Sequence, residues 1–549
     1  MSVVGLTNEK HASQWSRART THNRFAGSHE SLEAGGTHEY ATRVNSLSLS
    51  NHQLFNGRYL KPLASFLSRP DMSREGARDA PIAATLHHYE ICNKHIVRHN
   101  PHIYESTDEF LNAKTNRVAQ RDIYFLSGPP SAEWLNCLGF VLDVPTRFWM
   151  SHLDFFAGRG QDEISMQSSL LSAPRVVSLT VPSVVFVGHP GRHLSQEQLQ
   201  SARQQAGQEI QSRLQRCRRN HQTKPLYRAL NVHKGDLLSV EQKISMLLIS
   251  PHSSKQDADA HQGWSVFVYS DACQAPHGLE DVLAKIDDFK DETKLRFCPL
   301  ALSSGGARSV NQSNLKMQAA EHNMSALSYL ASEYESLYPM AEIQKPFDTL
   351  AGIFEVTLAS TATLLCLLES TIDEQLEHFR QPADEVFEYA TSLTFQVHRG
   401  VLRHHERQLR RIGCFINESG GLGWHSDSST TTKSQIWEHM LAATEQLQEE
   451  VESLINKCDQ GEVMVDRRRS AEQFHKSDYH AQLILRLTHI TTFATMVLLP
   501  LSILTSVFGM NFQEFDRETV LGIWVWGASA AGCTVLSLVF WSYFIRRQD

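Results

Sequence analysis

Residues 487–513 read LTHITTFATMVLLPLSILTSVFGMNFQ, and this stretch decides the fold. Its 27 residues include no Asp, Glu, Lys or Arg, and residues 519–545 form a second uncharged run of the same length. A membrane-spanning helix needs about 20 mostly apolar residues. We therefore expect two transmembrane helices, at 487–512 and 521–545. The alternative is a pair of buried core helices, which rarely run so long without a charge.

The charges that flank the two runs predict the orientation in the membrane. The connector at 513–520 carries more acidic than basic residues, and a basic tail at 546–549 closes the chain. Positively charged flanks stay on the cytoplasmic side, so we expect a multi-pass integral membrane protein with both termini in the cytosol. The N-terminus has no apolar segment typical of a secretory signal. The flanking basic residues are Arg467, Arg468, Arg469, Arg486, Arg546 and Arg547.

The composition of the 549-residue chain narrows the class of protein. Hydrophobic residues make up 41% and charged residues 20%, which is enough apolar surface for a sizeable core. The net charge of −8 lacks the basic excess of nucleic-acid-binding proteins, so no nucleic-acid partner is expected. Nine Cys occur without a C-x-x-C pair, which indicates a reducing compartment rather than a disulfide framework. Acidic residues near the N-terminus argue against a transit peptide, so the plasma membrane is favoured over an organelle membrane.

The residues before the first uncharged run divide into four regions. Residues 1–80 are polar without a sustained period, and we expect them to be disordered. Residues 81–300 mix strand and helix patterns, which predicts an α/β soluble domain. Residues 301–430 carry apolar positions at three- and four-residue spacing, typical of a helical bundle. Residues 431–486 are expected to form a long stalk helix that leads into the first span.

Individual elements follow from local patterns. Within the bundle, residues 343–380 are apolar, yet Glu355 and Glu369 interrupt them, so we interpret this segment as a buried bundle helix rather than a membrane span. In the stalk, apolar residues seven apart indicate a coiled-coil-like seam at Met440, Leu447 and Leu454. The predicted strands of the soluble domain are 123–127, 176–187, 244–249 and 265–269, and its predicted helices include 131–138 and 195–218.

The tripeptide Gly509-Met510-Asn511 stands where the first uncharged run ends. Together with Pro500, the apolar residues between, the acidic connector and a second terminal run, it resembles the motif of the CorA metal-ion transporter superfamily. The resemblance is strongest over residues 465–549, and upstream only the layout agrees. Outside this layout the tripeptide would be interpreted as a helix cap, with Gly509 ending the helix.

The resemblance implies a CorA-like fold, in which an α+β cytosolic domain is followed by long helices and two C-terminal transmembrane helices. It also implies a homopentamer whose first span lines a pore and whose second span faces lipid. The function implied is passage of hydrated divalent cations, with Mg²⁺ favoured as cargo and no cofactor. A ring of Asn511 amide oxygens would hydrogen-bond the hydration shell of Mg²⁺, which gives up water reluctantly. The alternatives are a Zn²⁺ transporter of the same fold, or a non-conducting membrane-anchored sensor or scaffold.

Helical spacing back from Asn511 selects the side chains that would face the pore. Ser and Thr hydroxyls can contact hydrated ions, and a Leu ring can form a hydrophobic constriction. The candidate pore-lining residues are Ser502, Leu499, Thr495 and Thr491.

The acidic residues of the connector are candidates for the pore entrance, where negative charge would raise the local concentration of cations. An ordinary solvated acidic loop explains any single one of them equally well. These residues are Glu514, Asp516 and Glu518.

Other patterns carry less information. His95 and His99 have the i,i+4 spacing of helical metal ligands, but Pro101 follows and no Cys or carboxylate completes a set, so a solvated loop is favoured and metal ligands remain unassigned. The sequence contains no G-x-x-x-x-G-K-[ST], G-x-S-x-G or H-E-x-x-H motif. We therefore expect no enzyme and assign no catalytic residue.

Overall fold

The computed structural model divides the chain into two compact units, residues 1–461 and 462–549, and each is described by itself. The boundary lies within one long helix, α14, whose first part belongs to the first unit and whose remainder belongs to the second. The residues that the structure describes are 32–52, 55–69, 84–92, 95–96, 101–114, 121–154, 175–188, 194–219, 226–249, 264–272, 277–290, 295–300, 324–337, 345–378, 385–418, 424, 435–509 and 520–546.

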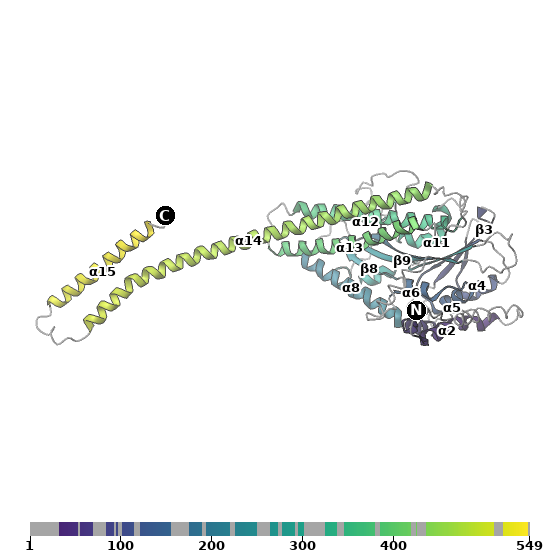
Figure 1. Ribbon diagram of the computed structural model, residues 1–549, viewed down its shortest axis with the longest axis horizontal. Helices are drawn as coiled ribbons and strands as arrows, with labels where there is room; N and C mark the ends of the chain where they lie inside the picture. Colours follow the sequence, from purple (N-terminus) through teal and green to yellow (C-terminus); the bar gives the residue numbers. More distant parts are fainter. Residues whose placement is uncertain are drawn as a thin grey trace, which may run out of the picture. The chain divides into compact units, whose positions relative to one another are not determined.

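A mixed sheet organises the first unit (Figure 1). Its main path runs β11-β7-β9-β10-β6-β3-β4, with β5 paired to β3 and β8 paired to β9. All of these pairs are antiparallel except β10 with β6, which is parallel. The strands are β3 (Thr85–Cys92), β4 (His95–Ile96), β5 (His102–Tyr104), β6 (Arg121–Ser127), β7 (Val176–Val187), β8 (Ala229–Val232), β9 (Leu237–Ile249), β10 (Trp264–Ser270) and β11 (Leu295–Phe297).

The four strands predicted from the sequence are present as β6, β7, β9 and β10. β9 is longer than predicted, because it begins at Leu237 and includes charged residues. His95 lies in the short strand β4 rather than in a helix. The helical metal-ligand spacing considered for His95 and His99 therefore does not arise, and His99 lies outside the described residues.

Helices cover both faces of this sheet (Figure 1). On one face, α2, α3, α5 and α6 enclose an apolar core with β3, β6 and β10, and α8 and α9 pack near β7, β8 and β11. These helices and the nearby α4 are α2 (Leu32–Leu49), α3 (Lys61–Leu67), α4 (Thr107–Lys114), α5 (Ala132–Val141), α6 (Thr146–His152), α8 (Gln196–Arg219) and α9 (His277–Leu283).

The helix α2 corrects the disorder expected for residues 1–80. Tyr40 and Val44 are buried in the core, and the Tyr40 hydroxyl donates a hydrogen bond to the Val144 carbonyl at 2.8 Å. A Cβ on Gly139 would lie 2.5 Å from the Tyr40 ring. The glycine at this position of α5 therefore leaves room for the Tyr40 side chain of α2. The helix depends on this packing rather than on local propensity. The part of 1–80 outside 32–52 and 55–69 lies outside the described residues.

The other face of the sheet carries a helical bundle, as the sequence predicted. The interpretation of 343–380 as a buried bundle helix is confirmed, because α12 packs against β7 and most of its apolar residues are buried. Its buried Thr357 and Thr361 satisfy their hydroxyls by donating to the carbonyls four residues earlier, at 2.8 Å each. The bundle comprises α11 (Ala326–Leu337), α12 (Ala351–His378), α13 (Glu385–Glu418) and the first part of α14 (Gln435–Gly509).

Aromatic side chains and one polar contact hold this bundle to itself and to the sheet. The Trp437 ring of α14 stacks on Phe347 with centroids 3.8 Å apart, and contacts Phe354 of α12 edge-on. The Gln408 side chain of α13 bonds both backbone groups of Thr180 in β7. The bundle and the sheet thus form one packed body within the first unit.

Candidate functional site

The tripeptide Gly509-Met510-Asn511 is the candidate ion-selectivity filter. Most of it lies outside the part of the chain that the structure describes. Gly509 is the last described residue of α14. Met510, Asn511 and the acidic entrance residues Glu514, Asp516 and Glu518 fall in the stretch 510–519, outside the described residues. Their roles stay predictions.

Two helices form an antiparallel hairpin in the second unit. The Ser537 hydroxyl of α15 (Val520–Arg546) donates a hydrogen bond to the Met496 carbonyl of α14 at 3.2 Å. The Trp541 ring packs edge-on against Phe493, with centroids 5.2 Å apart, and against His489 at 6.2 Å. Positions 489, 493 and 496 follow the i, i+4, i+7 spacing of one helix face. That face of α14 is therefore the one covered by α15.

Three of the four predicted pore-lining residues lie on the side of α14 that is turned away from α15. Thr491, Thr495, Leu499 and Ser502 are all exposed in the single chain. At about 100° per residue, Thr491, Thr495 and Ser502 point away from the stripe that contacts Trp541, and Leu499 lies at about a right angle to it. The Thr491 and Thr495 hydroxyls donate to the carbonyls four residues earlier, at 2.9 and 2.7 Å. Because each hydroxyl hydrogen is used, the oxygen lone pairs remain available as acceptors.

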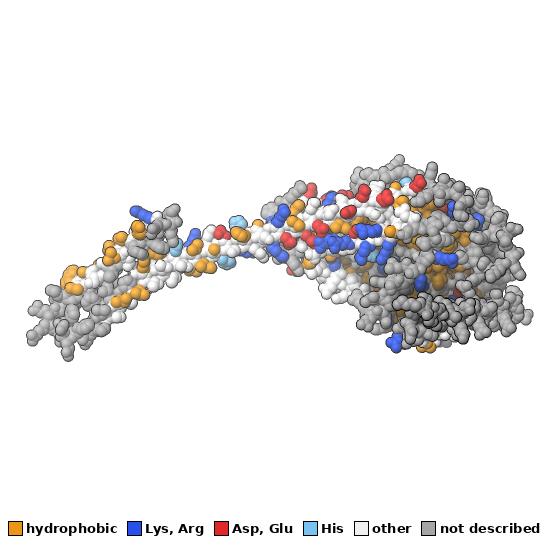
Figure 2. All heavy atoms as spheres, viewed as in Figure 1, with side chains coloured by type: hydrophobic (Ala, Val, Ile, Leu, Met, Phe, Trp, Pro, Cys, Tyr) orange, Lys and Arg blue, Asp and Glu red, His pale blue; other side chains and the backbone are white. Residues whose placement is uncertain are grey.

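The surface of this hairpin is strongly apolar (Figure 2). Leu498 is 61% exposed and Leu536 is 70% exposed, and many neighbours on both helices are similar. A contiguous apolar surface of this kind marks contact with lipid or with another protein chain. The exposed apolar residues in this part of the second unit include Ile490, Leu498, Leu499, Ile503, Trp524, Val525, Val535, Leu536, Leu538, Val539 and Tyr543.

Among the described residues, one helical segment is long and apolar enough to cross a membrane. This segment is Asp348–Glu377. Its apolar window is 72% buried inside the first unit, as befits the core helix α12. Gly527–Tyr543 in α15 is a shorter apolar segment. The two C-terminal transmembrane helices therefore stay a prediction, supported by the uncharged runs and the apolar hairpin surface.

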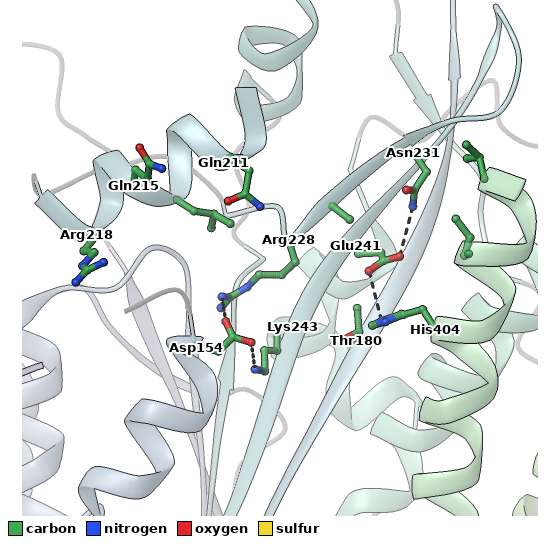
Figure 3. A pocket seen from close by; sticks show the side chains of 15 residues that line it. Asp154, Thr180, Gln211, Gln215, Arg218, Arg228, Asn231, Glu241, Lys243 and His404 are labelled. Carbon is green, nitrogen blue, oxygen red and sulfur yellow. Dashed lines mark hydrogen bonds and ion pairs between the residues drawn. The ribbon is translucent and has the colours of Figure 1, made fainter. Parts of the chain in front are cut away.

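The first unit contains a polar cleft of about 760 Å³ (Figure 3). Helices α8 and α13 form its walls, and strands β7, β8 and β9 form its floor. Asp154, two residues after the end of α6, closes one end beside Arg228 and Lys243. The lining residues are Asp154, Thr180, Gln211, Leu214, Gln215, Arg218, Arg228, Ala229, Asn231, Glu241, Lys243, Val397, Gly400, Val401 and His404.

A network of buried charges lies under one end of this cleft. Arg228 binds both carboxylate oxygens of Asp271, with Nε to Oδ2 at 2.5 Å and Nη2 to Oδ1 at 2.8 Å. It also donates from Nη1 to Asp154 at 2.8 Å, and Lys243 Nζ contacts the other Asp154 oxygen at 2.7 Å. His152 Nε2 donates to Asp271 Oδ1, 3.0 Å away. Two cations and two carboxylates thus balance one another at the floor.

The network shifts the ionisation of its members. Burial alone would raise the pKa of Asp271, but Arg228 and His152 hold it well below its ordinary value. Burial lowers the pKa of His152 to about 4, against the opposing attraction of Asp271. The imidazole is therefore neutral at pH 7, whereas the carboxylate is charged.

Ser245, His152 and Asp271 are linked in the order of a hydrolytic triad. His152 Nδ1 lies 2.9 Å from the Ser245 hydroxyl, and Nε2 lies 3.0 Å from Asp271. All three residues are completely buried, and none of them lines the cleft. A nucleophile must meet its substrate, so the contacts are structural and no catalytic role is assigned to them.

The other end of the cleft carries Glu241 and two histidines of α13. Glu241 is buried, and its carboxylate oxygens lie 3.6 Å from His404 Nε2 and 3.7 Å from His405 Nε2. Burial would raise the pKa of Glu241, but His405 and His404 bring it below its ordinary value. His405 is completely buried.

The cleft residues were missed because β9 was predicted only from Ile244 onwards. The signal is a period-two polar pattern, in which Ser239, Glu241, Lys243 and Ser245 share one face of the strand. Antiparallel pairing places Ser178 and Thr180 of β7 beside Ser245 and Lys243. An apolar pattern alone does not predict a strand across Glu241 and Lys243, whose charged partners come from the tertiary structure.

Metal ligation is not evident in the described part of the chain. Among those residues, no group of three or more His, Cys, Asp or Glu side chains is placed to hold a metal ion. In the histidine-rich segment, His87 and His88 are buried in β3, and His88 Nε2 lies 2.9 Å from Asp122 Oδ1. His88 also stacks on Tyr124 with centroids 4.4 Å apart. These two histidines belong to the core.

Among known proteins, solved structures show similarity to this chain. No protein-family model matches the chain, and no curated protein matches it. Among solved structures, the CorA magnesium transporter from Methanocaldococcus jannaschii is similar over 84% of this chain and 98% of that chain, with 11% sequence identity and a TM-score of 0.28. With values this low, the function has to be argued from the residues of the chain itself.

Proposed function

We propose that this chain is the subunit of an oligomeric membrane channel for hydrated divalent cations, with Mg²⁺ as the favoured ion. The observation that carries the proposal is the arrangement of α14, where Thr491, Thr495 and Ser502 are exposed on the side turned away from α15, with Leu499 exposed at the edge of that side. A hairpin with one face covered by its own second helix leaves the other face for an axis shared with further copies. This is how a two-helix chain can build a pore.

Lipid contact is supported by the apolar surface of the hairpin. Two uncharged runs of 27 residues are each long enough to cross the hydrocarbon core. Trp524 and Tyr543 lie near opposite ends of α15 and are 75% and 62% exposed, the placement of membrane-interface aromatics. Water would be a poor solvent for this surface. The orientation with both termini in the cytosol rests on the basic flanks.

The filter is assigned to Asn511 on the motif. A neutral amide ring accepts hydrogen bonds from the water shell of Mg²⁺ without stripping it. Gly509, at the end of α14, permits the sharp turn that leads to it. Glu514, Asp516 and Glu518 would concentrate cations at the entrance, and Leu499 would form a hydrophobic constriction in the pore. Five copies, which the motif resemblance implies, would complete the ring.

Uptake into liposomes tests the proposal. Purified wild-type protein is expected to admit Mg²⁺, read by an internal indicator, and Asn511→Ala is expected to abolish that flux while the oligomer stays intact. Glu514→Ala serves as the matched control, because it should only reduce the flux, and more so at low salt. Native mass measurement in detergent should give a pentamer.

Results other than the expected Mg²⁺ flux would point to the alternative functions. Flux of Zn²⁺ in place of Mg²⁺ would assign the second ion. A stable monomer, or no flux of either ion, would favour the non-conducting membrane anchor. Unchanged Mg²⁺ flux in Asn511→Ala would remove the filter assignment.

A further inference from the structure

We propose that the cleft of the first unit binds a small anionic ligand, carrying a phosphate or a carboxylate, in the seat now filled by the Asp154 carboxylate. Three cationic side chains line the cleft: Arg218 from α8, Arg228 immediately before β8, and Lys243 from β9. Figure 3 shows Asp154 between the Arg228 and Lys243 side chains. The proposal concerns the soluble unit alone and does not depend on ion conduction by the second unit.

The seat is built to hold two oxygens of one anion. Arg228 Nη1 donates to Asp154 Oδ1 at 2.8 Å, and Lys243 Nζ donates to Oδ2 at 2.7 Å. Hydrogen bonds between charged partners at these distances are the strong class, and they recognise carboxylate and phosphate alike. The structure thus displays the contact that an external anion would make.

The two cations of the site are buried, whereas the Asp154 carboxylate that they bind is exposed. The side chains of Arg228 and Lys243 are only 10% and 12% exposed, whereas that of Asp154 is 57% exposed. The cations are fixed in the floor by further bonds, from Arg228 to Asp271 and from Lys243 to the Ser151 carbonyl. The anion can leave for solvent, and the cations cannot follow it.

The charge balance favours replacement rather than an empty seat. Without Asp154, Asp271 would be the only carboxylate bonded to Arg228 in the described network, and the Lys243 ammonium would have no carboxylate within bonding distance. A buried cation that loses its partner is costly. Arg218 makes no ion pair with any described residue. A ligand with a double negative charge would therefore find more positive charge here than Asp154 alone neutralises.

The cleft has room for more than an ion. Its volume is about 760 Å³, within the usual range of small-molecule sites. A Cβ placed on Gly400 of α13 would meet nothing within 4 Å, so this wall is open. Asn231 and Glu241 at the far end offer hydrogen-bonding groups to the body of a ligand.

Titration calorimetry on the full-length protein tests the site, with inorganic phosphate and succinate as probes in separate arms. Asp154→Asn removes the competing charge and should bind at least one probe about tenfold more tightly than the wild type does. Gly400→Phe should abolish binding, because its ring would fill the cleft. Gly207→Phe is the matched control, since Gly207 of α8 also has nothing within 4 Å and does not line the cleft. The arm that responds identifies the ligand as phosphate or carboxylate.

A second measurement covers the case in which Asp154→Asn fails to fold. In the wild type, the responding probe should raise the midpoint of thermal unfolding, because it binds only the folded state. Gly400→Phe should remove this rise, and Gly207→Phe should keep it. The proposal is overturned if neither probe stabilises the wild type or binds Asp154→Asn, or if Gly400→Phe binds as the wild type does.

Discussion

Arg228 and Asp271 form a buried pair at the floor of the cleft, in which the guanidinium binds both oxygens of the carboxylate at 2.5 and 2.8 Å. Asp271 follows β10 and Arg228 precedes β8, and 43 residues of chain separate them. The same guanidinium donates to the His152 carbonyl at the end of α6. One ion pair therefore joins three elements at the floor of the cleft.

Removing the carboxylate of this pair should strongly destabilise the first unit. Asp271→Asn leaves the Arg228 charge buried with Asp154 as its remaining carboxylate partner. Breaking a buried ion pair costs about 3–5 kcal/mol of unfolding free energy. Urea unfolding of the full chain in detergent, followed by circular dichroism, measures the loss.

The control for that change is a surface pair of similar length. Arg43 and Asp143 lie 2.9 Å apart, with side chains 43% and 53% exposed. Because water screens such a pair, Asp143→Asn should cost less than about 1 kcal/mol. An equal loss in both variants would contradict a special role for burial at Asp271.

Stability should fall as the pH drops below 6.5, through His152. Burial lowers the pKa of His152 to about 4, from 6.5 in an unfolded chain. The unfolded chain therefore binds more protons between these values, so its free energy falls relative to the folded state as pH falls. The stabilisation is fully present above about pH 6.5 and is lost progressively towards pH 4. Unfolding midpoints at several pH values measure the slope.

The variant His152→Gln should make this pH dependence less steep, because it removes the titrating ring. Part of the slope should remain, since burial also lowers the pKa of His233 to about 3. His475→Gln, at an exposed position on α14, should leave the slope unchanged. A slope that is the same in all three proteins would refute the assignment.

Two glycines in the bundle should respond to alanine in opposite directions. A Cβ on Gly461 of α14 would lie 2.7 Å from the ring of the fully buried Phe395 of α13, so Gly461→Ala must push these helices apart. Gly413 of α13 has its nearest neighbour at 3.6 Å, so Gly413→Ala should gain up to about 1 kcal/mol from helix propensity. Thermal unfolding of the two variants compares them, and a stabilising Gly461→Ala would contradict the close approach.

Water should reach the face of α14 that is turned away from α15, if that face lines a pore. In a background with Cys533→Ser, Thr495→Cys should react with a membrane-impermeant thiol reagent in the assembled protein. Leu536→Cys, on the exposed apolar surface of α15, should react more slowly because it faces lipid. The rate of labelling, read by mass spectrometry, checks both. Equal rates at the two positions would count against the pore axis assigned here.

The sequence alone determined the elements with long and regular patterns. The sequence predicted a stalk helix over 431–486 that leads into an apolar helix from residue 487, and α14 runs without a break over Gln435–Gly509. Alternating or continuous β-branched residues predicted β6, β7 and β10 within one or two residues. Glu355 and Glu369 indicated that α12 is a bundle helix. A charged side chain at the centre of a membrane has a high free energy, which falls when the charge contacts water or an ionic partner. These signals depend only on residues close together in the sequence, so each can be recognised within a single segment.

The tertiary structure decided where polar residues find partners. Glu241 and Lys243 are unfavourable in a buried strand by themselves, and α13 and Asp154 supply their counter-charges. The helix α2 has little apolar periodicity, and the pocket around Tyr40 makes it part of the core. The cleft exists because β9, α8 and α13, distant in sequence, converge on it. Burial of a charge is unfavourable unless a partner from elsewhere in the chain meets it, and that pairing is a property of the packed fold rather than of any one segment.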